Sequence, residues 1–529
     1  MKLRLQSIFL LFALSVWSAC QPQQQQTKGF ELEEKTVADL QAMMENGTHT
    51  AVSICQLYID RIKAIDQGEN GLRAVIELNP EALTIAAALD KERAEGKVRG
   101  PLHGIPVMIK DNINTGDNMG TTAGSLALVG SDVRNDAFIV SKLRESGAIL
   151  LGKTNLSEWA NFRSERSSSG WSGRGRQTRN PYAMDRSPCG SSSGSGVAVS
   201  ANLCAVTIGT ETNGSIVCPS SLNGVVGIKP TVGLWSRSGI IPISKTQDTA
   251  GPMARSLTDA ATLLGALVGS DPEDEMTQDS TAVVYKDYTQ FLDPNGLEGK
   301  RIGIFRGPMG LHEGVDAIME ESFVAMEAAG AILVDSIALG EMHYLGNAEY
   351  ELLLYEFKDG LNAYLAGLTN DFPHKNIGDL IEYNRQNKEQ EMPYFQQEIF
   401  ELAESKGDLS DEEYQKAFAL CQKISRTDGI DLAIEKHNLD AIVAPTGDPA
   451  WVIDKINGDN YRISSSSMPA MAGYPNVTVP AGDVEGLPIG ISFFSTAYTE
   501  ADLISIAYGF EQKTKARIVP KLLPTLELP

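Results

Sequence analysis

Apolar residues recur at two spacings along this 529-residue chain, and each spacing predicts a different element. Between residues 36 and 67 they fall three or four positions apart, as in Val37, Leu40 and Met44, which is the period of an amphipathic helix. From about residue 72 to 267 they form short runs bounded by Gly-rich turns: AVIEL, IPVMIK, AILLG, AVTIG and VVGIK. Such runs predict buried strands, and interposed helical stretches such as AFIVSKLRESG make the segment α/β.

The strand pattern returns in the second half of the chain, in KRIGIF (residues 300–305), AILVDSI, LDAIVAP, NVTVPAG and IGISFF. Residues from about 340 to 436 interrupt it, because they lack strand signals and are rich in Glu, Lys, Leu and Tyr. We therefore expect one large α/β unit, from which residues 340–436 depart as a helical excursion that forms a wall or cover.

Composition and charge narrow the function classes. With 42% hydrophobic and 21% charged residues, the chain is expected to fold around a packed core. A net charge of −23 without a basic run argues against a nucleic-acid partner. The six cysteines lack CxxC spacing, so neither a disulfide scaffold nor a zinc site is expected, and no metal or cofactor is predicted. Most cysteines should be buried apolar residues, although an oxidising compartment would permit a bridge.

The N-terminus has the pattern of an export signal. Lys2 and Arg4 precede an apolar stretch, residues 8–17, which is too short to span a bilayer. Residues 1–19 are therefore predicted to be a signal peptide, followed by a Gln-rich linker, residues 20–35. Cys20 follows Ser-Ala, as at a bacterial lipoprotein processing site. A lipid on Cys20 would be the only contact of the protein with a membrane surface. The alternative is cleavage of the signal peptide without a lipid, which releases the protein. Either outcome predicts a periplasmic protein or a membrane-anchored lipoprotein of a bacterium.

Two Ser/Gly clusters, GSSSGSG and TETNGS, flank an apolar segment within residues 188–231. Ser215 ends the second cluster, after Asn213 and Gly214, which both tolerate left-handed backbone geometry. A serine on such a turn, where backbone N–H groups converge, suits an acyl-transfer nucleophile beside an oxyanion hole. The apolar segments that surround the two clusters are typical of buried strands, which argues against a flexible linker. No phosphate-binding pattern occurs in the clusters.

A serine nucleophile needs a base, and the residues offer two. GSSSG matches G-x-S-x-G with Ser192 at its centre, so an α/β-hydrolase with His103 as base is one alternative, although His103 is more typical of a turn residue. Lys110 ends the apolar strand IPVMIK, where desolvation can remove its proton and make it a base. Asp111 should point to the opposite face of that strand. The alternative for Lys110 is a strand-end lysine that reaches solvent.

Several motifs, in order, resemble the amidase signature family: GIPVMIKDN, GKTNLSEWA, PCGSSSGSG, GTETNGSI, NGVVGIKPT, QDTAGPMARS and YPNVTVPAG. They cover most of residues 60–500. Within that family the chain is most similar to bacterial peptide amidases, through LSEWANFRS, QTRNPY, GTETNGSIVCP and LLLYEFK. The resemblance implies an amidase signature domain over residues 36–525, built on a large mixed β-sheet with helices on both faces.

The resemblance also implies roles for single residues. Ser215 aligns with the nucleophile, Ser191 with the serine that relays protons, and Lys110 with the base. The implied oxyanion hole consists of the backbone N–H groups of Thr212, Asn213, Gly214 and Ser215. The chain departs from the common family pattern at three positions, with Asn213 and Ser193 where Gly is usual and Glu211 where Asp is usual.

The function implied is that of a serine amidase that hydrolyses carbon–nitrogen bonds of small-molecule or peptide amides through an acyl-enzyme. The C-terminal amide of peptides is one implied substrate, and a general aliphatic or aryl amidase is the alternative. The amide-hydrolysing component of a tRNA-dependent amidotransferase belongs to the same family, and the export signal argues against it. A non-catalytic exported binding protein on this fold is the alternative from another class. The oligomeric state stays open.

Overall fold

One mixed sheet of 11 strands forms the centre of the computed structural model, which describes residues 29–131, 133, 135–340, 345–369 and 371–526. Its strand order is β1-β3-β2-β6-β8-β7-β12-β13-β11-β9-β10. The strands are β1 (Val75–Leu78), β2 (Pro106–Lys110), β3 (Ile149–Thr154), β6 (Val206–Glu211), β7 (Val226–Lys229), β8 (Thr249–Ala254), β9 (Arg301–Ile304), β10 (Ile332–Val334), β11 (Ala441–Pro445), β12 (Asn476–Val484) and β13 (Leu487–Phe494). A separate ribbon pairs β4 (Trp171–Ser172) with β5 (Arg176–Gln177).

Parallel pairing of β2 with both β3 and β6 fixes the geometry at one edge of the sheet. Ile109 lies opposite Ile208, so Lys110, the last residue of β2, lies close to the last residues of β6. Because the carboxyl ends of parallel strands meet at one edge, the segments that follow β2 and β6 are brought together. The chain segment after β6 contains Ser215.

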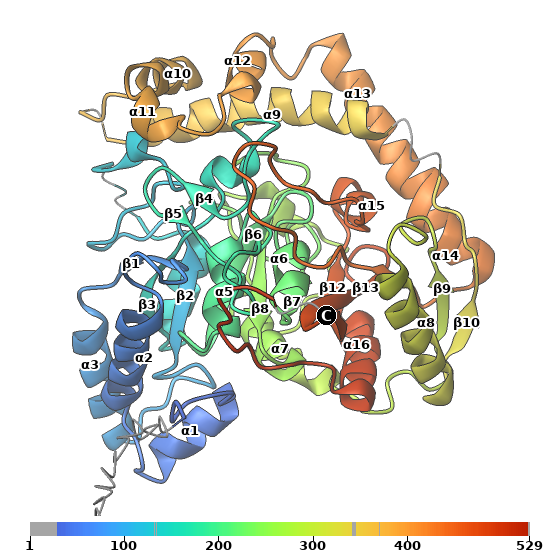
Figure 1. The fold of residues 1–529 in the computed structure, drawn as a ribbon, viewed down its shortest axis with the longest axis horizontal. Coiled ribbons are helices and arrows are strands. Elements are labelled where there is room, and N and C mark those ends of the chain that lie inside the picture. Colours follow the sequence, from blue (N-terminus) through green and yellow to red (C-terminus); the bar gives the residue numbers. More distant parts are fainter. Residues whose placement is uncertain (1–28, 132, 134, 341–344, 370, 527–529) are drawn as a thin grey trace, which may run out of the picture.

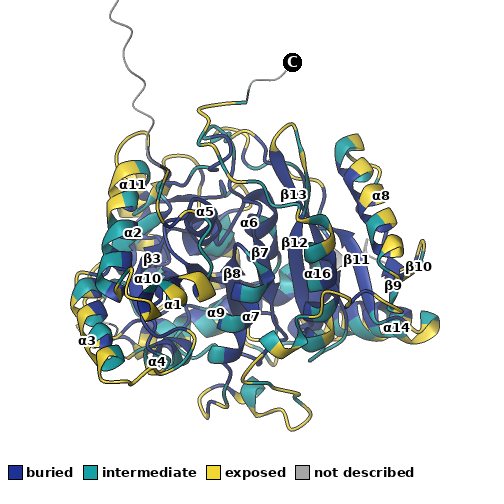
Figure 2. Ribbon diagram, turned by 90° about the horizontal axis from the view of Figure 1, so that it is seen from below, coloured by how far each residue is buried: buried dark blue, intermediate teal, exposed yellow. Residues whose placement is uncertain are grey.

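Helices cover both faces of the sheet, as Figures 1 and 2 show, with buried residues toward the strands and exposed residues outward. They are α1 (Val37–Glu45), α2 (Ala51–Ile65), α3 (Ala82–Ala94), α4 (Phe138–Glu145), α5 (Ser193–Ser200), α6 (Val217–Leu222), α7 (Leu257–Ala266), α8 (Glu313–Ala328), α15 (Ser467–Ala472) and α16 (Glu500–Thr514). The fold class expected from the sequence is confirmed. No helix in the described ranges is long and apolar enough to cross a membrane.

Two elements differ from the sequence pattern. The apolar segment after GSSSG, expected as a strand, is the helix α5, and all its residues are buried, so it has no polar face to reveal a helical period. Strand β8 was not expected, because its sequence TAGPMA contains Gly and Pro, which weaken strand propensity. It pairs antiparallel with β6 and β7, so the neighbouring strands impose its conformation.

The segment expected to be helical, about 340–436, runs across one end of the molecule in Figure 1. It contains α9 (Leu345–Gly367), α10 (Ile377–Gln386), α11 (Lys388–Glu391), α12 (Glu398–Glu404), α13 (Glu412–Gln422), a π-helical stretch (Lys423–Ile430) and α14 (Asp431–His437). Its apolar side chains form a second core that continues onto the sheet through Phe305, Ile442 and Phe494. This shared core holds the helices against the strands.

A buried ionic cluster joins these helices to the sheet unit. The Arg163 side chain is fully buried, and its Nε lies 2.8 Å from Oε1 of Glu158. The same guanidinium donates to the carbonyl of Glu391, at 2.8 Å, and lies over the ring of Phe395. Burial, together with the neighbouring carboxyl of Glu391, raises the pKa of Glu158 well above its ordinary value. Arg163 is therefore the cation that makes two buried carboxyl groups tolerable.

We expect Arg163→Met to lower the free energy of unfolding by about 3–5 kcal/mol, because it leaves a buried carboxyl pair without its cation. Chemical denaturation measures the change, and Arg166→Met, which removes an exposed arginine three positions along, is the matched control. Equal stability of the two variants would contradict the role assigned to Arg163.

Candidate functional site

An open cleft of about 380 Å³ lies where the segment after β6 meets helix α9. Ser215 and Gly190 line it from the two Ser/Gly clusters, and Glu349 and Tyr350 line it from α9. The 446–467 region, which includes Trp451, supplies another part of its wall. The Ser/Gly clusters therefore meet in a cavity that the helical segment helps to enclose.

Lys110 lies below this cleft with no exposure to solvent. Its Nζ lies 2.7 Å from Oγ of Ser191, and it also contacts Ser192 Oγ, at 3.1 Å, and the Thr210 side chain and carbonyl, at 2.8 and 3.1 Å. Burial lowers the pKa of Lys110 to about 7, against the opposing effect of the Asp248 and Glu211 carboxylates. The alternative in which Lys110 reaches solvent is therefore excluded.

Asp111 does not contact the Lys110 amine, as expected from strand alternation. Its carboxylate accepts hydrogen bonds from the Thr122 hydroxyl and the Gly124 N–H, and it pairs with Arg174 at 3.4 Å. The amine of Lys110 is thus left among hydroxyls and one carbonyl.

The two serine segments are joined by their backbones. The Ser192 N–H donates to the Ser215 carbonyl at 3.1 Å, and the Gly190–Ser191 peptide bond is cis. Ser215 is 8% exposed and faces the cleft, whereas Ser191 is fully buried beside Lys110. In the described part of the chain Ser215 Oγ makes no hydrogen bond to Ser191 Oγ, so the structure brings Lys110 and Ser191 into direct contact and Ser215 beside them.

Residues 212–215 line the cleft, and none of their four backbone N–H groups donates to another described residue. Gly214 has a φ of +79°, which explains the glycine in TNGS. Free N–H groups on one turn are what an oxyanion needs. The loop predicted from the sequence therefore carries unpaired backbone N–H groups in the wall of the cleft.

Side chains far away in sequence hold this loop. Thr212 Oγ1 donates to Asp248 at 2.5 Å, and Asn213 Nδ2 donates to Glu349 at 2.7 Å. Ser466 Oγ donates to the Asn213 side-chain oxygen at 2.6 Å. Sequence reasoning missed all three partners; Asp248 lies in the motif QDTAGPMARS, while nothing in the sequence marked the other two.

Glu211, one of the departures from the family pattern, satisfies the start of α6. Its Oε2 accepts hydrogen bonds from the N–H groups of Ile216 and Val217, at 2.7 and 3.0 Å. Ser193, another departure, donates to the Cys189 carbonyl at 2.6 Å. Both side chains therefore make a local structural contact in this chain.

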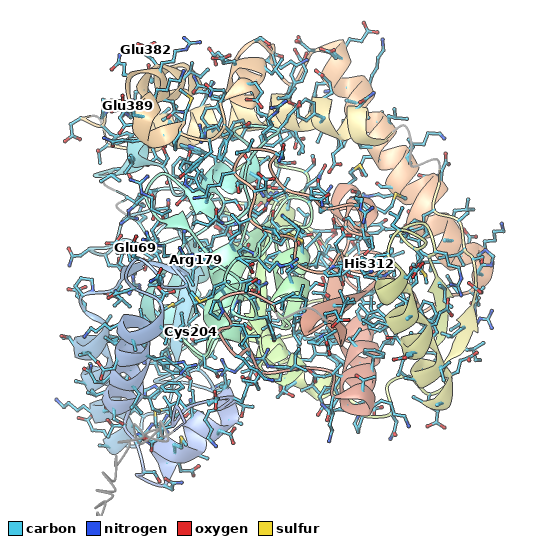
Figure 3. All side chains as sticks on the ribbon, viewed as in Figure 1. Glu69, Arg179, Cys204, His312, Glu382 and Glu389 are labelled. Carbon is cyan, nitrogen blue, oxygen red and sulfur yellow. A yellow bond between two sulfur atoms is a disulfide. The ribbon has the colours of Figure 1, made fainter. Side chains whose placement is uncertain are left out.

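The alternative with a histidine base finds no support in the geometry. His103 Nε2 bonds to the Leu89 carbonyl, at 3.0 Å, and its Nδ1 faces the Arg99 N–H. Ser192 is fully buried and bonded to the Thr210 backbone. His312 accepts hydrogen bonds at the start of α8, where Figure 3 labels it. None of these groups forms a serine–histidine pair.

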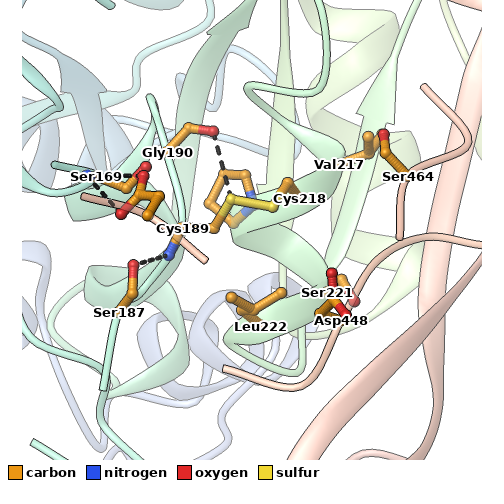
Figure 4. The surroundings of a disulfide bond; sticks show 12 residues. Ser169, Ser187, Cys189, Gly190, Val217, Cys218, Ser221, Leu222, Asp448 and Ser464 are labelled. Carbon is orange, nitrogen blue, oxygen red and sulfur yellow. Dashed lines mark hydrogen bonds between the residues drawn. A yellow bond between two sulfur atoms is a disulfide. The ribbon is translucent and has the colours of Figure 1, made fainter. Parts of the chain in front are cut away.

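A disulfide joins the two serine segments (Figure 4). Cys189 precedes Ser191 by two positions, Cys218 follows Ser215 by three, and both cysteines line the cleft. The cross-link therefore limits how far the two segments can separate. Three other cysteines, Cys55, Cys204 and Cys421, are buried and free, as expected of small apolar residues.

Known proteins resemble this chain over most of its length. The native peptide amidase from Stenotrophomonas maltophilia is 50% identical with a TM-score of 0.89, covering 93% of this chain and 99% of that one. A probable amidase of Arabidopsis thaliana is 41% identical, over 96% of this chain and 95% of its own length. A glutamyl-tRNA(Gln) amidotransferase subunit of Thermosynechococcus vestitus is 33% identical, over 90% of this chain and 98% of its own length.

The predicted localisation is wrong. The curated relatives that match are named as amidases of a plant and of fungi and as glutamyl-tRNA(Gln) amidotransferase subunits, and none of these names is that of an exported lipoprotein. The prediction depended only on the composition of the first twenty residues, and a short apolar run after two cations does not by itself define an export signal. Residues 1–28, which include Cys20 and most of the Gln-rich linker, lie outside the described residues.

The model of the family described as Amidase matches residues 53–504. That range contains the buried Lys110, both Ser/Gly clusters and the cleft that they line. The chain therefore belongs to the amidase signature family and is an amidohydrolase that acts on linear carbon–nitrogen amide bonds.

Proposed function

We propose that this chain hydrolyses amides through a Ser-Ser-Lys triad, in which Ser215 is the nucleophile, Ser191 the proton relay and Lys110 the base. The observation that carries the proposal is the 2.7 Å contact between the buried Lys110 Nζ and Ser191 Oγ, directly beside the cleft-lining Ser215. The Thr210 carbonyl can only accept, so it takes one N–H of the amine. The Ser192 hydroxyl donates to that same carbonyl and can accept the second N–H, which leaves the lone pair of a neutral amine for a hydroxyl proton such as that of Ser191.

The first half of the reaction forms the acyl-enzyme. Ser215 Oγ attacks the amide carbonyl as its proton passes to Ser191 and the Ser191 proton passes to Lys110. The carbonyl oxygen takes the electron pair and is stabilised by the N–H groups of residues 212–215. When the intermediate collapses, the C–N bond breaks, and the proton returns through Ser191 to the departing nitrogen. Ammonia or an amine leaves.

The second half repeats the relay with water. A water molecule loses a proton to the Ser191–Lys110 pair and attacks the ester carbon of acylated Ser215. The C–O bond to Ser215 breaks, Ser215 regains a proton, and a carboxylic acid leaves. The carboxylates that hold the 212–215 loop do not take part in these transfers; they fix the position of the donors.

Primary amides at the C-terminus of peptides are the substrates we propose. The support is the 50% identity to a peptide amidase over 93% of this chain. An open cleft of about 380 Å³ has room for several residues of an acyl chain beyond the scissile amide.

Ser215→Ala should reduce kcat for ammonia release from an N-acetylated dipeptide amide by at least about 10⁴-fold, as in other enzymes whose nucleophile acts as part of a triad. It should also abolish labelling by a fluorophosphonate probe. Ser220→Ala is the matched control, since Ser220 is a buried serine on α6 whose hydroxyl has no hydrogen-bond partner among the described residues. Activity of Ser215→Ala equal to that of the control would refute Ser215 as the nucleophile, whereas a wild-type protein without activity or probe labelling would favour the non-catalytic alternative.

The pH profile tests Lys110. An amine with a pKa of about 7 is charged below that pH and neutral above it, so kcat/KM should fall about tenfold per pH unit below 7 and level off above. Lys110→Met should lose most of the rate at every pH. The control is Lys153→Met, because Lys153 is equally buried on β3 and bonds to the Ile113 carbonyl instead of a serine. If Lys153→Met removes the pH dependence and Lys110→Met keeps it, the base has been misassigned.

A further inference from the structure

The charged side chains that line the catalytic cleft are all acidic. Glu349 and Asp459 are its two ionisable carboxyls, and no lysine, arginine or histidine of the described residues lines it. Every charged side chain that a bound substrate can contact in the cleft is therefore acidic.

Glu349 has a carboxyl oxygen without a partner. Only 9% of the residue is exposed, and Oε1 accepts both of its hydrogen bonds, from Asn213 at 2.7 Å and from Gln247 at 3.0 Å. Within the described residues, Oε2 accepts none and no cation contacts the carboxyl. Burial raises the pKa of Glu349, as expected where no positive charge compensates.

Asp459 also lines the cleft, and no described residue supplies it with a cation. It accepts hydrogen bonds from the Trp451 indole, at 3.1 Å, and from the Ser169 N–H, at 3.0 Å. Ser169 lies beside Gly190 and the disulfide in Figure 4, so Asp459 is held against the catalytic segments. Burial raises its pKa as well. No ion pair to Asp459 occurs in the part of the chain that the structure describes.

Aromatic rings accompany the second carboxylate. The rings of Trp451 and Tyr461 lie 6.0 Å apart and both line the cleft. Aromatic faces favour the methylene stem and the charged head of a basic side chain. A carboxylate beside such rings has the chemistry of a cation-binding subsite.

We propose that Glu349 and Asp459 form a subsite for a positively charged group on the acyl part of the amide substrate. This inference rests on the proposed function, since it assumes that the acyl part occupies this cleft. The cation supplies the charge that both carboxyls lack, whereas the carboxylate of the hydrolysed product is repelled and leaves. The cation is either a basic side chain or a free α-ammonium group.

A purely structural role for the two carboxyls gives a different expectation. Both accept hydrogen bonds from loop donors, and an amide in their place would accept the same bonds. Under that role, the Asp459→Asn and Glu349→Gln variants would keep the wild-type ratio of kcat/KM between charged and uncharged substrates. The charge dependence of specificity therefore separates the two roles.

The test compares kcat/KM for three N-acetylated amides of similar length: lysine amide, norleucine amide and glutamate α-amide. Wild type should prefer the lysine amide to norleucine amide by at least about fivefold and disfavour the glutamate amide, with both differences reduced in about 0.5 M salt. Asp459→Asn and Glu349→Gln should each bring the lysine-to-norleucine ratio toward one. Free norleucine amide, compared with its N-acetyl form, tells an α-ammonium source from a side-chain source.

Asp454→Asn is the matched control, because Asp454 lies five positions before Asp459 and bonds only within its own exposed turn. It should keep the wild-type ratio. Equal kcat/KM for all three N-acetylated amides together with no preference for free over N-acetylated norleucine amide, or preferences that stay unchanged in both cleft variants, would overturn the subsite.

Binding to the Ser215→Ala protein, measured by calorimetry with the same amides, separates the subsite from the chemistry. Tighter binding of lysine amide without turnover in wild type would leave the subsite standing and remove the proposed function. Turnover of all three amides with no charge preference in rate or binding would leave the proposed function standing and remove the subsite.

Discussion

A lysine amine kept away from water and surrounded by hydroxyl groups is the interaction on which the site depends. Lys110 ends a strand that is buried on both faces, so desolvation favours its neutral form near pH 7. An exposed amine in the same place would stay protonated and would have no lone pair for Ser191. The core of the sheet is therefore part of the proposed chemistry, because it supplies the low dielectric that lowers the pKa of Lys110, the proposed base.

The rest of the sheet brings the two serine segments to that amine. Parallel pairing of β2 with β6 places the loop after β6 beside Lys110, and the disulfide between Cys189 and Cys218 links that loop to the other serine segment. Asp248 and Glu349 then hold the loop through its side chains, so its N–H groups stay free for a ligand. Preorganised donors of this kind cost no rearrangement when charge develops on a substrate oxygen.

The helical segment contributes to both stability and selectivity. Its core continues onto the sheet, and the buried Arg163 cluster ties the two together. Helix α9 at the same time presents Glu349 to the cleft. One excursion of the chain thus encloses the cavity, fixes the 212–215 loop and sets the sign of the charge that a substrate meets.

By itself the sequence determined the strands around Lys110 and the family, and it predicted the three residues of the proposed triad, because strand runs and Ser/Gly motifs are local signals. It misassigned α5, where complete burial erases periodicity, and overlooked β8, whose neighbours impose its conformation. Only the tertiary structure decided that Glu349 and Ser466 hold the 212–215 loop and that the cleft is acidic. Those contacts join residues more than 100 positions apart, and no local pattern encodes which distant side chains the fold brings together.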